Sequence, residues 1–428
     1  MGQRVAHLLV VHAAELVTLA GPPGPRAGAA QSQLAIVEDG AVAIGADGRI
    51  IAVGPTAHVR DEVTLAPDAL VLDAHGRTVL PGFVDPHTHA VFAGDRVAEF
   101  EQRLAGADYL AILAAGGGIL QTVRATRAAS FDDLFRRADH VLDRMLLAGT
   151  TALEIKTGYG LNTETELKQL RVIAQLAQQR PQAIVGTLLA AHAVPPEFHG
   201  DPDAYVDVVC TETIPAAAAL GIARFCDVFC EVGVFSVEQA RRVLEVGLRY
   251  GLRPKLHAEQ KHHLGGAQLA ATLGAISADH LEYAEDTDLV AMRDAGVIAV
   301  LLPGAAFFLR EQRHAPARRM VELGVPVALG TDFNPGSSPI WSMPLAIGLA
   351  CLEQGLTPAE AIVAATINAA YAIGLGESHG SLEPGKYGNL VILDAPSYRY
   401  LPYYFGASLV DTVVLNGQVV VQEGRLCR

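Results

Sequence analysis

The stretch that decides the fold is Pro81-Gly82-Phe83-Val84-Asp85-Pro86-His87-Thr88-His89. The apolar residues before Asp85 are typical of a buried strand, and side chains two positions apart on a strand point to the same side. His87 and His89 therefore share one face, while Thr88 points to the other. An isolated His-x-His pair is more often incidental than functional. The rest of the sequence decides between incidental histidines and two ligands that converge on a metal ion.

Length and composition narrow the class of protein. The chain has 428 residues, of which 50% are hydrophobic and 18% charged, enough for one large core and a second, smaller unit. Its formal net charge of -14 argues against a nucleic-acid partner, which requires a basic surface. An anionic substrate must therefore be held by local positive groups rather than attracted by the protein as a whole.

The five cysteines are an odd number and lie far apart, which argues against a disulfide framework and favours a reducing compartment. Cys226 and Cys230 lack a second Cys or His pair nearby, so we interpret them as core residues rather than zinc ligands. The apolar run over 5–20 is interrupted by polar residues and falls short of the ~18 uninterrupted residues of a membrane span. We expect a cytoplasmic protein without a membrane partner.

Both ends of the chain are predicted to form short strands. Within residues 1–78, apolar runs separated by turn signals lie at 8–11, 34–37, 40–44 and 50–53. Residues 384–428 show the same pattern of short apolar runs, at 388–394, 410–415 and 419–421, with Asn416-Gly417 as a tight hairpin turn. We predict that the two ends pair into one small composite β-sandwich domain.

The middle of the chain, residues 79–383, alternates strand-like runs with helices. Strands are predicted over 79–84, 151–155, 183–189, 228–232, 253–256, 275–278, 297–302 and 325–329, and helices over 164–179, 237–250 and 358–372. About eight alternations, in a block longer than the roughly 250 residues required, predict an α/β fold with a (β/α)8 TIM-like barrel. In such a barrel, chemistry takes place at the carboxyl ends of the strands.

A residue able to bind a metal or a substrate follows nearly every predicted strand. These residues are His87, His89, Lys156, Tyr159, His192, Glu231, His257, His280 and Asp332. Fifteen histidines scattered at random would not gather at strand ends in this way. Others, including His140, His199, His262, His263, His314 and His379, are interpreted as surface or structural residues.

The quoted stretch resembles the first-strand signature of the amidohydrolase superfamily, and His257, His280 and Thr331-Asp332 fit its other metal and catalytic positions. Over essentially the whole chain, further blocks resemble the imidazolonepropionase family of that superfamily. One block is Glu154-Ile155-Lys156-Thr157-Gly158-Tyr159-Gly160, and the others lie at 92–96, 115–119, 122–127, 191–195 and 332–337. Together these blocks are highly specific, whereas the His-x-His pair alone is not.

The resemblance implies a mononuclear site in which His87, His89, His257 and Asp332 bind one divalent metal ion per chain, zinc or iron. It also implies a homodimer and hydrolysis of the ring C–N bond of 4-imidazolone-5-propanoate to N-formimidoyl-L-glutamate, a step of histidine degradation. Three imidazoles and a carboxylate suit both metals, and the ion lowers the pKa of a bound water to ~7.

Two residues are assigned to proton transfer. His280 stands at a strand end and is not needed as a ligand, so it is the candidate for orienting the water or accepting its proton. Asp332 is able to carry the proton to the leaving ring nitrogen. The alternative for His280 is a structural histidine of the core.

Gln260 distinguishes between reactions. Related deaminases place a glutamate three residues after the fifth-strand histidine, where this chain has Gln260. A glutamine does not titrate, but it hydrogen-bonds the N–H and the carbonyl of an imidazolone together. Gln260 is therefore a catalytic and substrate-binding candidate, and neighbouring Glu259 is expected to point away. The exchange favours ring opening over deamination.

The resemblance assigns further substrate contacts to Arg96, Tyr159, His192, Asn334, Gly336 and Ser337. Arg96 offers a forked donor for the propionate, and the backbone amides of the turn over 334–337 are expected to cradle an anion. Lys156 is expected to be a structural lysine paired with Glu154 or Glu231 rather than a bridge between two metals. The glycines at 116–118 lack the spacing of a phosphate loop and are expected to form a turn near the site.

Two other functions stay open. A deaminase of a purine-like or triazine ring would release ammonia, and Gln260 and Arg96 argue against it. A non-catalytic scaffold of the dihydropyrimidinase-like type would have lost the metal ligands, which this chain retains. We therefore expect an enzyme that acts on a small molecule.

Overall fold

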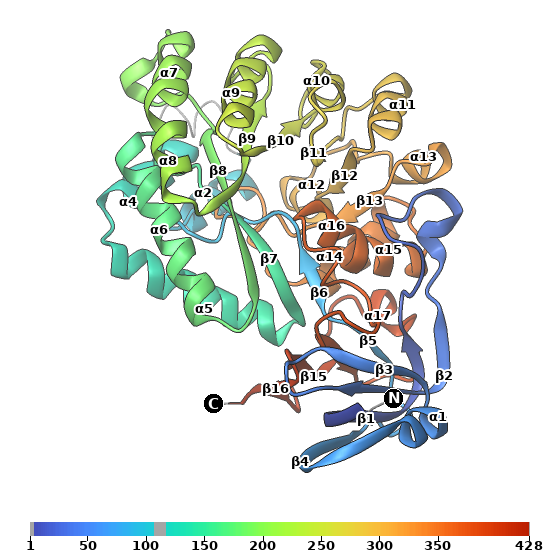
Figure 1. The fold of residues 1–428 in the computed structure, drawn as a ribbon. Helices are drawn as coiled ribbons and strands as arrows, with labels where there is room; N and C mark the ends of the chain where they lie inside the picture. The colour runs from blue at the N-terminus through green and yellow to red at the C-terminus, as the bar shows by residue number, and fades with distance from the viewer. Residues whose placement is uncertain (1–3, 107–116, 428) are drawn as a thin grey trace.

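The computed structural model describes residues 4–106 and 117–427. Its larger part is a parallel sheet of eight strands surrounded by helices (Figure 1). The strands are β6 (Phe83–Asp85), β7 (Thr150–Lys156), β8 (Ala183–Ala191), β9 (Ala223–Cys230), β10 (Arg253–Ala258), β11 (Ser277–His280), β12 (Ile298–Leu301) and β13 (Val327–Leu329). Each strand pairs in parallel with the next one along the chain, which is the strand order of a (β/α)8 barrel. The predicted fold class is confirmed.

The barrel closes just beyond the ends of its first and last strands. The backbone N–H of Asp332 donates to the carbonyl of His87 at 3.0 Å, and that of His89 donates to the carbonyl of Phe333 at 2.9 Å. At the end of β6, the buried carboxyl of Asp85 accepts from the backbone N–H and the hydroxyl of Thr331, at 3.0 and 2.6 Å. The stretch that carries the two histidines therefore also closes the cylinder.

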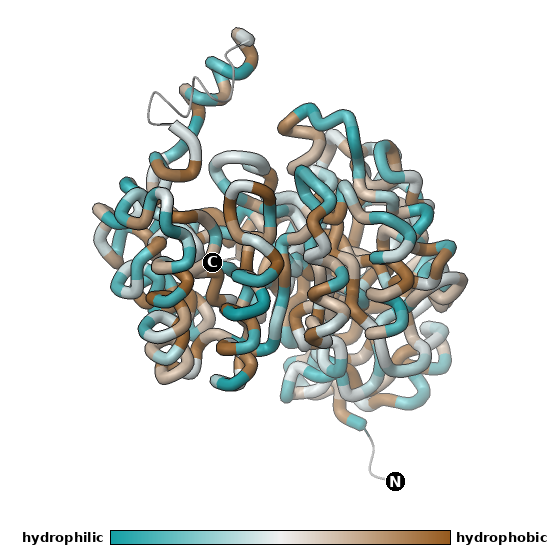
Figure 2. The backbone as a smooth tube through the Cα atoms, turned by 90° about the horizontal axis from the view of Figure 1, so that it is seen from above, coloured by the Kyte–Doolittle hydropathy of each residue, from teal (hydrophilic) through white to brown (hydrophobic). Residues whose placement is uncertain are grey.

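The barrel helices pack with their apolar sides against the strands. In α9 (Val237–Arg249) the buried residues Ala240, Val243, Leu244 and Gly247 follow the spacing of one helix face. The remaining barrel helices are α2 (Val97–Leu104), α4 (Ile119–Ala128), α5 (Phe131–Leu147), α6 (Thr163–Gln179), α7 (Pro202–Val208), α8 (Ile214–Leu220), α10 (Gly266–Thr272), α11 (Asp286–Ala295), α12 (Pro303–Leu309), α13 (Ala317–Leu323), α14 (Met343–Glu353), α15 (Pro358–Val363) and α16 (Ala369–Ala372). Figure 2 shows hydrophilic segments along much of the molecular rim.

Three of these helices were predicted from the sequence. Those over 164–179 and 237–250 are confirmed as α6 and α9. The helix over 358–372 is a continuous helical segment, in which a π-helical turn over Ala364–Asn368 joins α15 to α16.

Both chain ends meet in a second, mixed sheet, shown in the lower part of Figure 1. Its strands are β1 (Arg4–Val17), β2 (Ile36–Ile44), β3 (Ile50–Pro55), β4 (Val63–Asp73), β5 (Val79–Pro81), β14 (Leu390–Leu393), β15 (Val410–Leu415), β16 (Gln418–Gln422) and β17 (Arg425–Leu426). The order β14-β5-β1 joins the two ends, and α1 (Thr56–Glu62) packs beside the sheet. The short helix α17 (Tyr400–Tyr403) packs against α14 of the barrel. Positive φ angles at Asn416 and Gly417 form the predicted hairpin turn. The division into domains at residues 78 and 384 stays a prediction.

One predicted strand is two strands in the structure. The run over 79–84 splits at Gly82, so that β5 belongs to the mixed sheet and β6 to the barrel. A β-carbon at Gly82 would lie 2.2 Å from Cγ2 of Thr151, so only glycine fits where the chain passes between the two sheets. This crossing brings the mixed sheet directly beneath the first barrel strand.

The buried cysteines and the helices bear on two further expectations from the sequence. Cys226 and Cys230 are buried in the main hydrophobic cluster and form no disulfide, as expected for core residues. Among the helices of the described residues, none combines the length and apolar character needed to cross a bilayer.

Candidate metal centre and active site

The residues predicted at strand ends meet at one end of the barrel. His87 and His89 follow β6, His257 lies near the end of β10, His280 ends β11 and Asp332 follows β13. All five side chains are buried. Because the carboxyl ends of parallel strands lie at the same end of a barrel, residues far apart in sequence converge there.

The distances between these side chains are short. Nε2 of His87 lies 3.3 Å from Nε2 of His89, and Oδ1 of Asp332 lies 3.5 Å from each of the two nitrogens. A nitrogen of His257 lies within 4.8 Å of His87 and His280 in one cluster, and of His89 and His192 in another. The structure therefore brings all four predicted ligands to one place, with His280 and His192 beside them.

These residues fit a divalent transition metal. Nε2 of His257, the ring nitrogen not beside Asp227, is a buried atom without a hydrogen-bond partner in residues 4–106 and 117–427. Buried polar atoms are rarely left unpaired, so this nitrogen points to a missing partner. Donors that bind one tetrahedral zinc ion at ~2.0–2.1 Å lie roughly 3.3–3.5 Å apart, as the His87, His89 and Asp332 atoms do.

Two buried carboxylates stand behind the imidazoles, and sequence reasoning missed both. Oδ2 of Asp279 lies 2.6 Å from Nδ1 of His87, and Oδ2 of Asp227 lies 3.0 Å from Nδ1 of His257. A carboxylate at Nδ1 fixes the ring orientation and leaves Nε2 free to bind a metal. An available signal was the acidic residue inside an otherwise apolar strand, such as Asp227 in Phe225-Cys226-Asp227-Val228-Phe229.

The protonation states agree with this arrangement. Burial lowers the pKa of His87, His192 and His257, so these imidazoles are neutral, the form that binds metals and accepts hydrogen bonds. Burial also acts to lower the pKa of His280, but the nearby carboxylates of Glu282 and Asp332 outweigh it and raise that pKa. His280 thus differs from its neighbours in favouring the proton.

Several site residues have unusual backbone conformations. The φ angles of Glu259, His280 and Asp332 are 55°, 80° and 52°, a left-handed region that costs non-glycine residues free energy. Glu259 directly follows β10, His280 ends β11, and Asp332 follows β13 after Gly330 and Thr331. Positive φ angles also occur elsewhere in the described chain, as at Leu19 and Arg310, but these three belong to residues at the strand ends where the polar side chains converge.

Tyr159 and His192 line the side of the site next to His89. The His192 ring stacks on the His89 ring, with centroids 5.1 Å apart, and the Tyr159 ring lies 5.5 Å from that of His192. Nδ1 of His192 lies 3.0 Å from the carbonyl oxygen of Gly158. Because a carbonyl only accepts, Nδ1 carries the proton and Nε2 of His192 is an acceptor.

Arg96 is held in place before any substrate arrives. Its Nε and Nη2 atoms donate to the two carboxylate oxygens of Glu99, at 2.8 and 2.6 Å. Glu99 also accepts from the backbone N–H of Gly118 at 3.0 Å. The predicted turn over 116–118 thus reaches Arg96 through Gly118, although residue 116 lies outside the described residues.

The turn over 334–337 differs from its expected role as an anion cradle. The backbone N–H groups of Gly336 and Ser337 both donate to Oδ1 of Asn334, each at 2.8 Å. Their hydrogens are therefore taken within the turn and are not offered to a ligand. The Ser337 hydroxyl lies 3.3 Å from Oδ2 of Asp332, which places it beside the proposed ligands instead.

Glu259 and Gln260 separate as expected. The Glu259 carboxylate accepts from the backbone N–H groups of Leu264, Gly265 and Ala267, at 2.6, 3.0 and 3.1 Å, and so caps the start of α10. Gln260 is partly buried, and its amide has no hydrogen-bond partner within the described parts of the chain. Its donor and acceptor remain available to a ligand.

Lys156 is paired with Glu154, one of the two carboxylates considered for it, at 3.2 Å. Its ammonium also lies 2.8 Å from Asp227 and 3.3 Å from Asp279. Glu231, the other expected partner, instead accepts from the backbone N–H of Lys261 and contacts His262.

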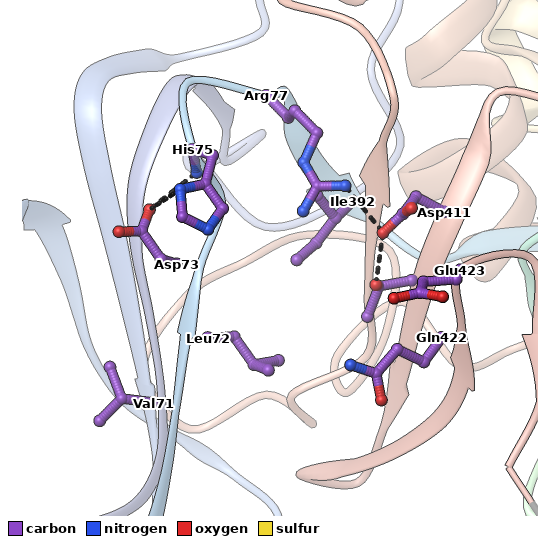
Figure 3. A pocket seen from close by; sticks show the side chains of 10 residues that line it. Val71, Leu72, Asp73, His75, Arg77, Ile392, Asp411, Gln422 and Glu423 are labelled. Carbon is purple, nitrogen blue, oxygen red and sulfur yellow. Dashed lines mark hydrogen bonds and ion pairs between the residues drawn. The ribbon is translucent and has the colours of Figure 1, made fainter.

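A separate cavity of about 430 Å³ lies in the mixed sheet, between β4 and the strands β15 and β16 (Figure 3). Its cation, Arg77, is already paired with Asp411 at 2.9 Å. The histidine cluster does not line this cavity, so we assign the chemistry to the barrel.

Comparison with known proteins identifies relatives over nearly the whole chain. A family model described as the amidohydrolase family matches residues 78–420. The imidazolonepropionase of Symbiobacterium thermophilum is 52% identical over 426 residues, which cover 99% of this chain and 100% of the relative. That of Geobacillus kaustophilus is also 52% identical and covers 98% of this chain and 99% of its own.

Solved structures share the fold. A zinc-bound adenosine deaminase from Xanthomonas campestris matches with a TM-score of 0.74 at 19% identity, over 100% of this chain and 95% of that one. An N-isopropylammelide isopropylaminohydrolase from Burkholderia multivorans matches with a TM-score of 0.69 at 20% identity, over 98% and 99% of the two chains. At these identities the likeness concerns the architecture alone.

Proposed function

Because the chain belongs to the amidohydrolase family and, within it, to the imidazolonepropionases, we propose that it hydrolyses 4-imidazolone-5-propanoate to N-formimidoyl-L-glutamate. One water adds across the ring amide. Its oxygen forms the new bond to the ring carbonyl carbon, the C–N bond breaks, and the leaving nitrogen gains a proton. The proposed ligands of the divalent ion are His87, His89, His257 and Asp332.

The observation that carries the proposal is the convergence of three buried imidazoles and one carboxylate, with Nε2 of His257 left without a hydrogen-bond partner among the described residues. An ion held there polarises the ring carbonyl and lowers the pKa of a water to about 7. The other tasks fall to side chains of this chain.

His280 is the proposed acceptor of the proton of the attacking water. It lies in one cluster with His87 and His257, and the surrounding carboxylates raise its pKa, which favours proton uptake. Asp332 lies against His87 and His89 and is the proposed carrier of the proton to the leaving nitrogen. Burial acts to raise the pKa of Asp332, but its hydrogen bond to His89 and the nearby imidazoles hold that pKa below its usual value.

Substrate binding is assigned to side chains around the ion. Arg96, oriented by Glu99, is proposed to bind the propionate, and Tyr159 and His192 to flank the ring. The free amide of Gln260 is proposed to hydrogen-bond the ring N–H and carbonyl together. Asn334, Gly336 and Ser337 are proposed to complete this side of the pocket.

The direct test is hydrolysis by purified protein. We expect the ultraviolet absorbance of the substrate to disappear, N-formimidoyl-L-glutamate to form, and no ammonia to be released. Metal analysis is expected to find near one zinc or iron ion per chain. Ammonia release from an aromatic amine, or full activity after complete removal of metal, would contradict the proposal.

His280→Ala tests the proton acceptor. It is expected to retain the metal and to lose about 10²- to 10⁴-fold in kcat, the usual contribution of a positioned base. His75→Ala, at an exposed histidine of the mixed sheet, is the matched control and is expected to leave kcat unchanged. Normal turnover by His280→Ala would remove this residue from the mechanism.

Oligomeric state and location complete the proposal. A homodimer in the cytoplasm is proposed from the resemblance to the family. Sedimentation analysis of the purified protein tests the homodimer, and fractionation of cells tests the cytoplasmic location.

A further inference from the structure

A buried lysine joins the two carboxylates that stand behind the imidazoles. Lys156, the last residue of β7, is fully buried, and its Nζ lies 2.8 Å from Oδ2 of Asp227 and 3.3 Å from Oδ2 of Asp279. The two aspartates come from β9 and β11. One ammonium therefore bridges strands that lie two apart in the barrel.

The oxygens that contact the ammonium also contact the histidines. Oδ2 of Asp227 is the atom 3.0 Å from Nδ1 of His257, and Oδ2 of Asp279 is the atom 2.6 Å from Nδ1 of His87. Each carboxylate thus has one oxygen between an ammonium and an imidazole. The Oδ1 atoms accept from the backbone N–H of Val228 at 2.7 Å and from the Ser277 hydroxyl at 2.6 Å, so Nζ is the group that holds the two Oδ2 atoms toward the rings. These oxygens in turn orient the two imidazoles.

A second buried lysine shows that this arrangement is particular to Lys156. Nζ of Lys255 lies 2.6 Å from Oε2 of Glu154, which is the only ion pair of Lys255 among the described residues. Lys255 therefore forms an ion pair with Glu154 and none with Asp227 or Asp279. Lys156 is the lysine that forms ion pairs with both Asp227 and Asp279.

The charges around Lys156 favour a bound cation nearby. Two ammonium groups, Lys156 and Lys255, face three carboxylates, Glu154, Asp227 and Asp279, which leaves one excess negative charge among fully buried side chains. Removing one partner of a buried ion pair leaves an uncompensated charge that rearranges its surroundings. Loss of the Lys156 ammonium would release the Oδ2 atom of each aspartate, the oxygen that faces an imidazole, while Oδ1 keeps its own hydrogen bond.

We infer that Lys156 is a positioning residue that orients His87 and His257 together, through Asp279 and Asp227, and so sets the affinity of the site for its divalent ion. This inference rests on the proposed metal site. One side chain thereby couples His87 and His257, two proposed ligands that are 257 − 87 = 170 residues apart in sequence. Groups that orient metal ligands typically change affinity about 10- to 100-fold when they are lost.

The test measures zinc affinity by competition with a chelator, using zinc alone as the probe. Lys156→Met is expected to bind zinc about 10- to 100-fold more weakly than the wild-type protein. Lys255→Met is the matched control, because it removes an equally buried ammonium from the same network. Its zinc affinity is expected to remain near the wild-type value, although both variants are expected to have a lower Tm.

A double variant covers the case in which Lys156→Met does not fold. Glu154→Gln with Lys156→Met removes one negative and one positive charge, so the buried net charge is that of the wild-type protein. Glu154→Gln alone is its reference, because Lys255 loses its ion pair in both proteins. Asp227 and Asp279 still lose their ammonium, and the same weakening of zinc binding is expected. Wild-type affinity in this folded double variant, or equal weakening in Lys255→Met, would overturn the inference.

The outcome for the wild-type protein separates this inference from the proposed function. A wild-type protein that binds zinc and hydrolyses the substrate, combined with unchanged zinc affinity in the Lys156 variants, contradicts the role of Lys156 alone. A wild-type protein that binds no divalent ion contradicts the proposed function itself.

Discussion

Arg96 and Gly336 are in direct contact: a β-carbon at Gly336 would lie 2.0 Å from Nη1 of Arg96. The guanidinium is already fixed on its other side by the two carboxylate oxygens of Glu99. Gly336 therefore provides the space into which Arg96 extends. We therefore propose that Gly336 serves substrate binding by admitting the arginine rather than by offering its own amide, which donates to Asn334.

Gly336→Ala is expected to displace Arg96 and weaken substrate binding. A charged hydrogen bond contributes about 1.5–3 kcal/mol, so KM is expected to rise about 10- to 100-fold while the metal content stays unchanged. Steady-state kinetics and metal analysis measure both. Because the obstructed atoms lie at the tip of a flexible side chain, stability is expected to change little.

Gly406→Ala is the control for this substitution. Nothing lies within 4 Å of a β-carbon at Gly406, and its backbone has no positive φ angle. An unchanged KM in Gly336→Ala, or an equal rise in Gly406→Ala, would contradict the assigned role of Arg96.

The loop that carries Tyr159 is fixed by one buried carboxylate. Glu166 in α6 accepts from the backbone N–H groups of Gly158, Gly160 and Leu161, at 3.0, 2.7 and 2.8 Å. Arg127 donates to the carbonyls of Gly160 and Leu161 from the other side. Tyr159 thus takes its position from two charged residues outside the predicted site.

Glu166→Gln is expected to loosen this loop, because an amide has only one acceptor oxygen for three donors. We expect KM to rise about tenfold, and stability to fall by about 1–3 kcal/mol from the unpaired amides. Kinetics and urea unfolding measure the two effects. In this background Tyr159→Phe is expected to add little, as for two residues that act together.

Glu360→Gln is the comparison for Glu166. The Glu360 carboxylate caps α15 and pairs with Arg318, away from the loop. It is expected to lower stability without changing KM. Full additivity between Glu166→Gln and Tyr159→Phe would show that the carboxylate does not act through the tyrosine.

The eight barrel strands could be predicted because each is a short apolar run between turn signals. The split at Gly82 could not, because an apolar run across two sheets has the same pattern as one strand. The strand β4 was not predicted from the sequence either, for a different reason. Its apolar side chains, such as Leu65, Leu70 and Val71, are exposed and carry no buried periodicity.

In the site, the sequence indicated residues at strand ends but not the carboxylates that support them. His87 and Asp279 are separated by 192 residues, and their contact arises only when β6 and β11 are placed in one barrel. The expected anion cradle failed for a local reason. The Asn334 side chain reaches the turn amides first, and side-chain acceptors of this kind compete with any ligand.

Gln260→Glu tests whether the amide serves the ring. A carboxylate cannot donate to the ring carbonyl, so we expect kcat/KM at pH 7 to fall about 10- to 100-fold with the metal retained. Gln268→Glu, at an exposed position of α10, makes the same change in net charge and is expected to have no effect. Equal activity of the Gln260 variant would show that donation by the amide is not needed.

His379 is expected to limit stability in acid. Burial, together with the charges of Lys386 and Arg49, lowers the pKa of His379 to about 4 from the usual 6.5. Below pH 6.5 the unfolded chain takes up a proton that the folded protein does not. The stability contributed by neutral His379 is therefore complete above 6.5 and is lost as the pH falls towards 4.

Between pH 7 and pH 5 this one group is expected to account for about 2 kcal/mol of lost stability. His379→Gln, which has no proton to gain, is expected to lose correspondingly less over the same interval in urea unfolding. His58→Gln, at an exposed histidine, is the control and is expected to follow the wild-type slope. An identical pH dependence of the His379 variant and the wild-type protein would show that this imidazole titrates normally in the folded state.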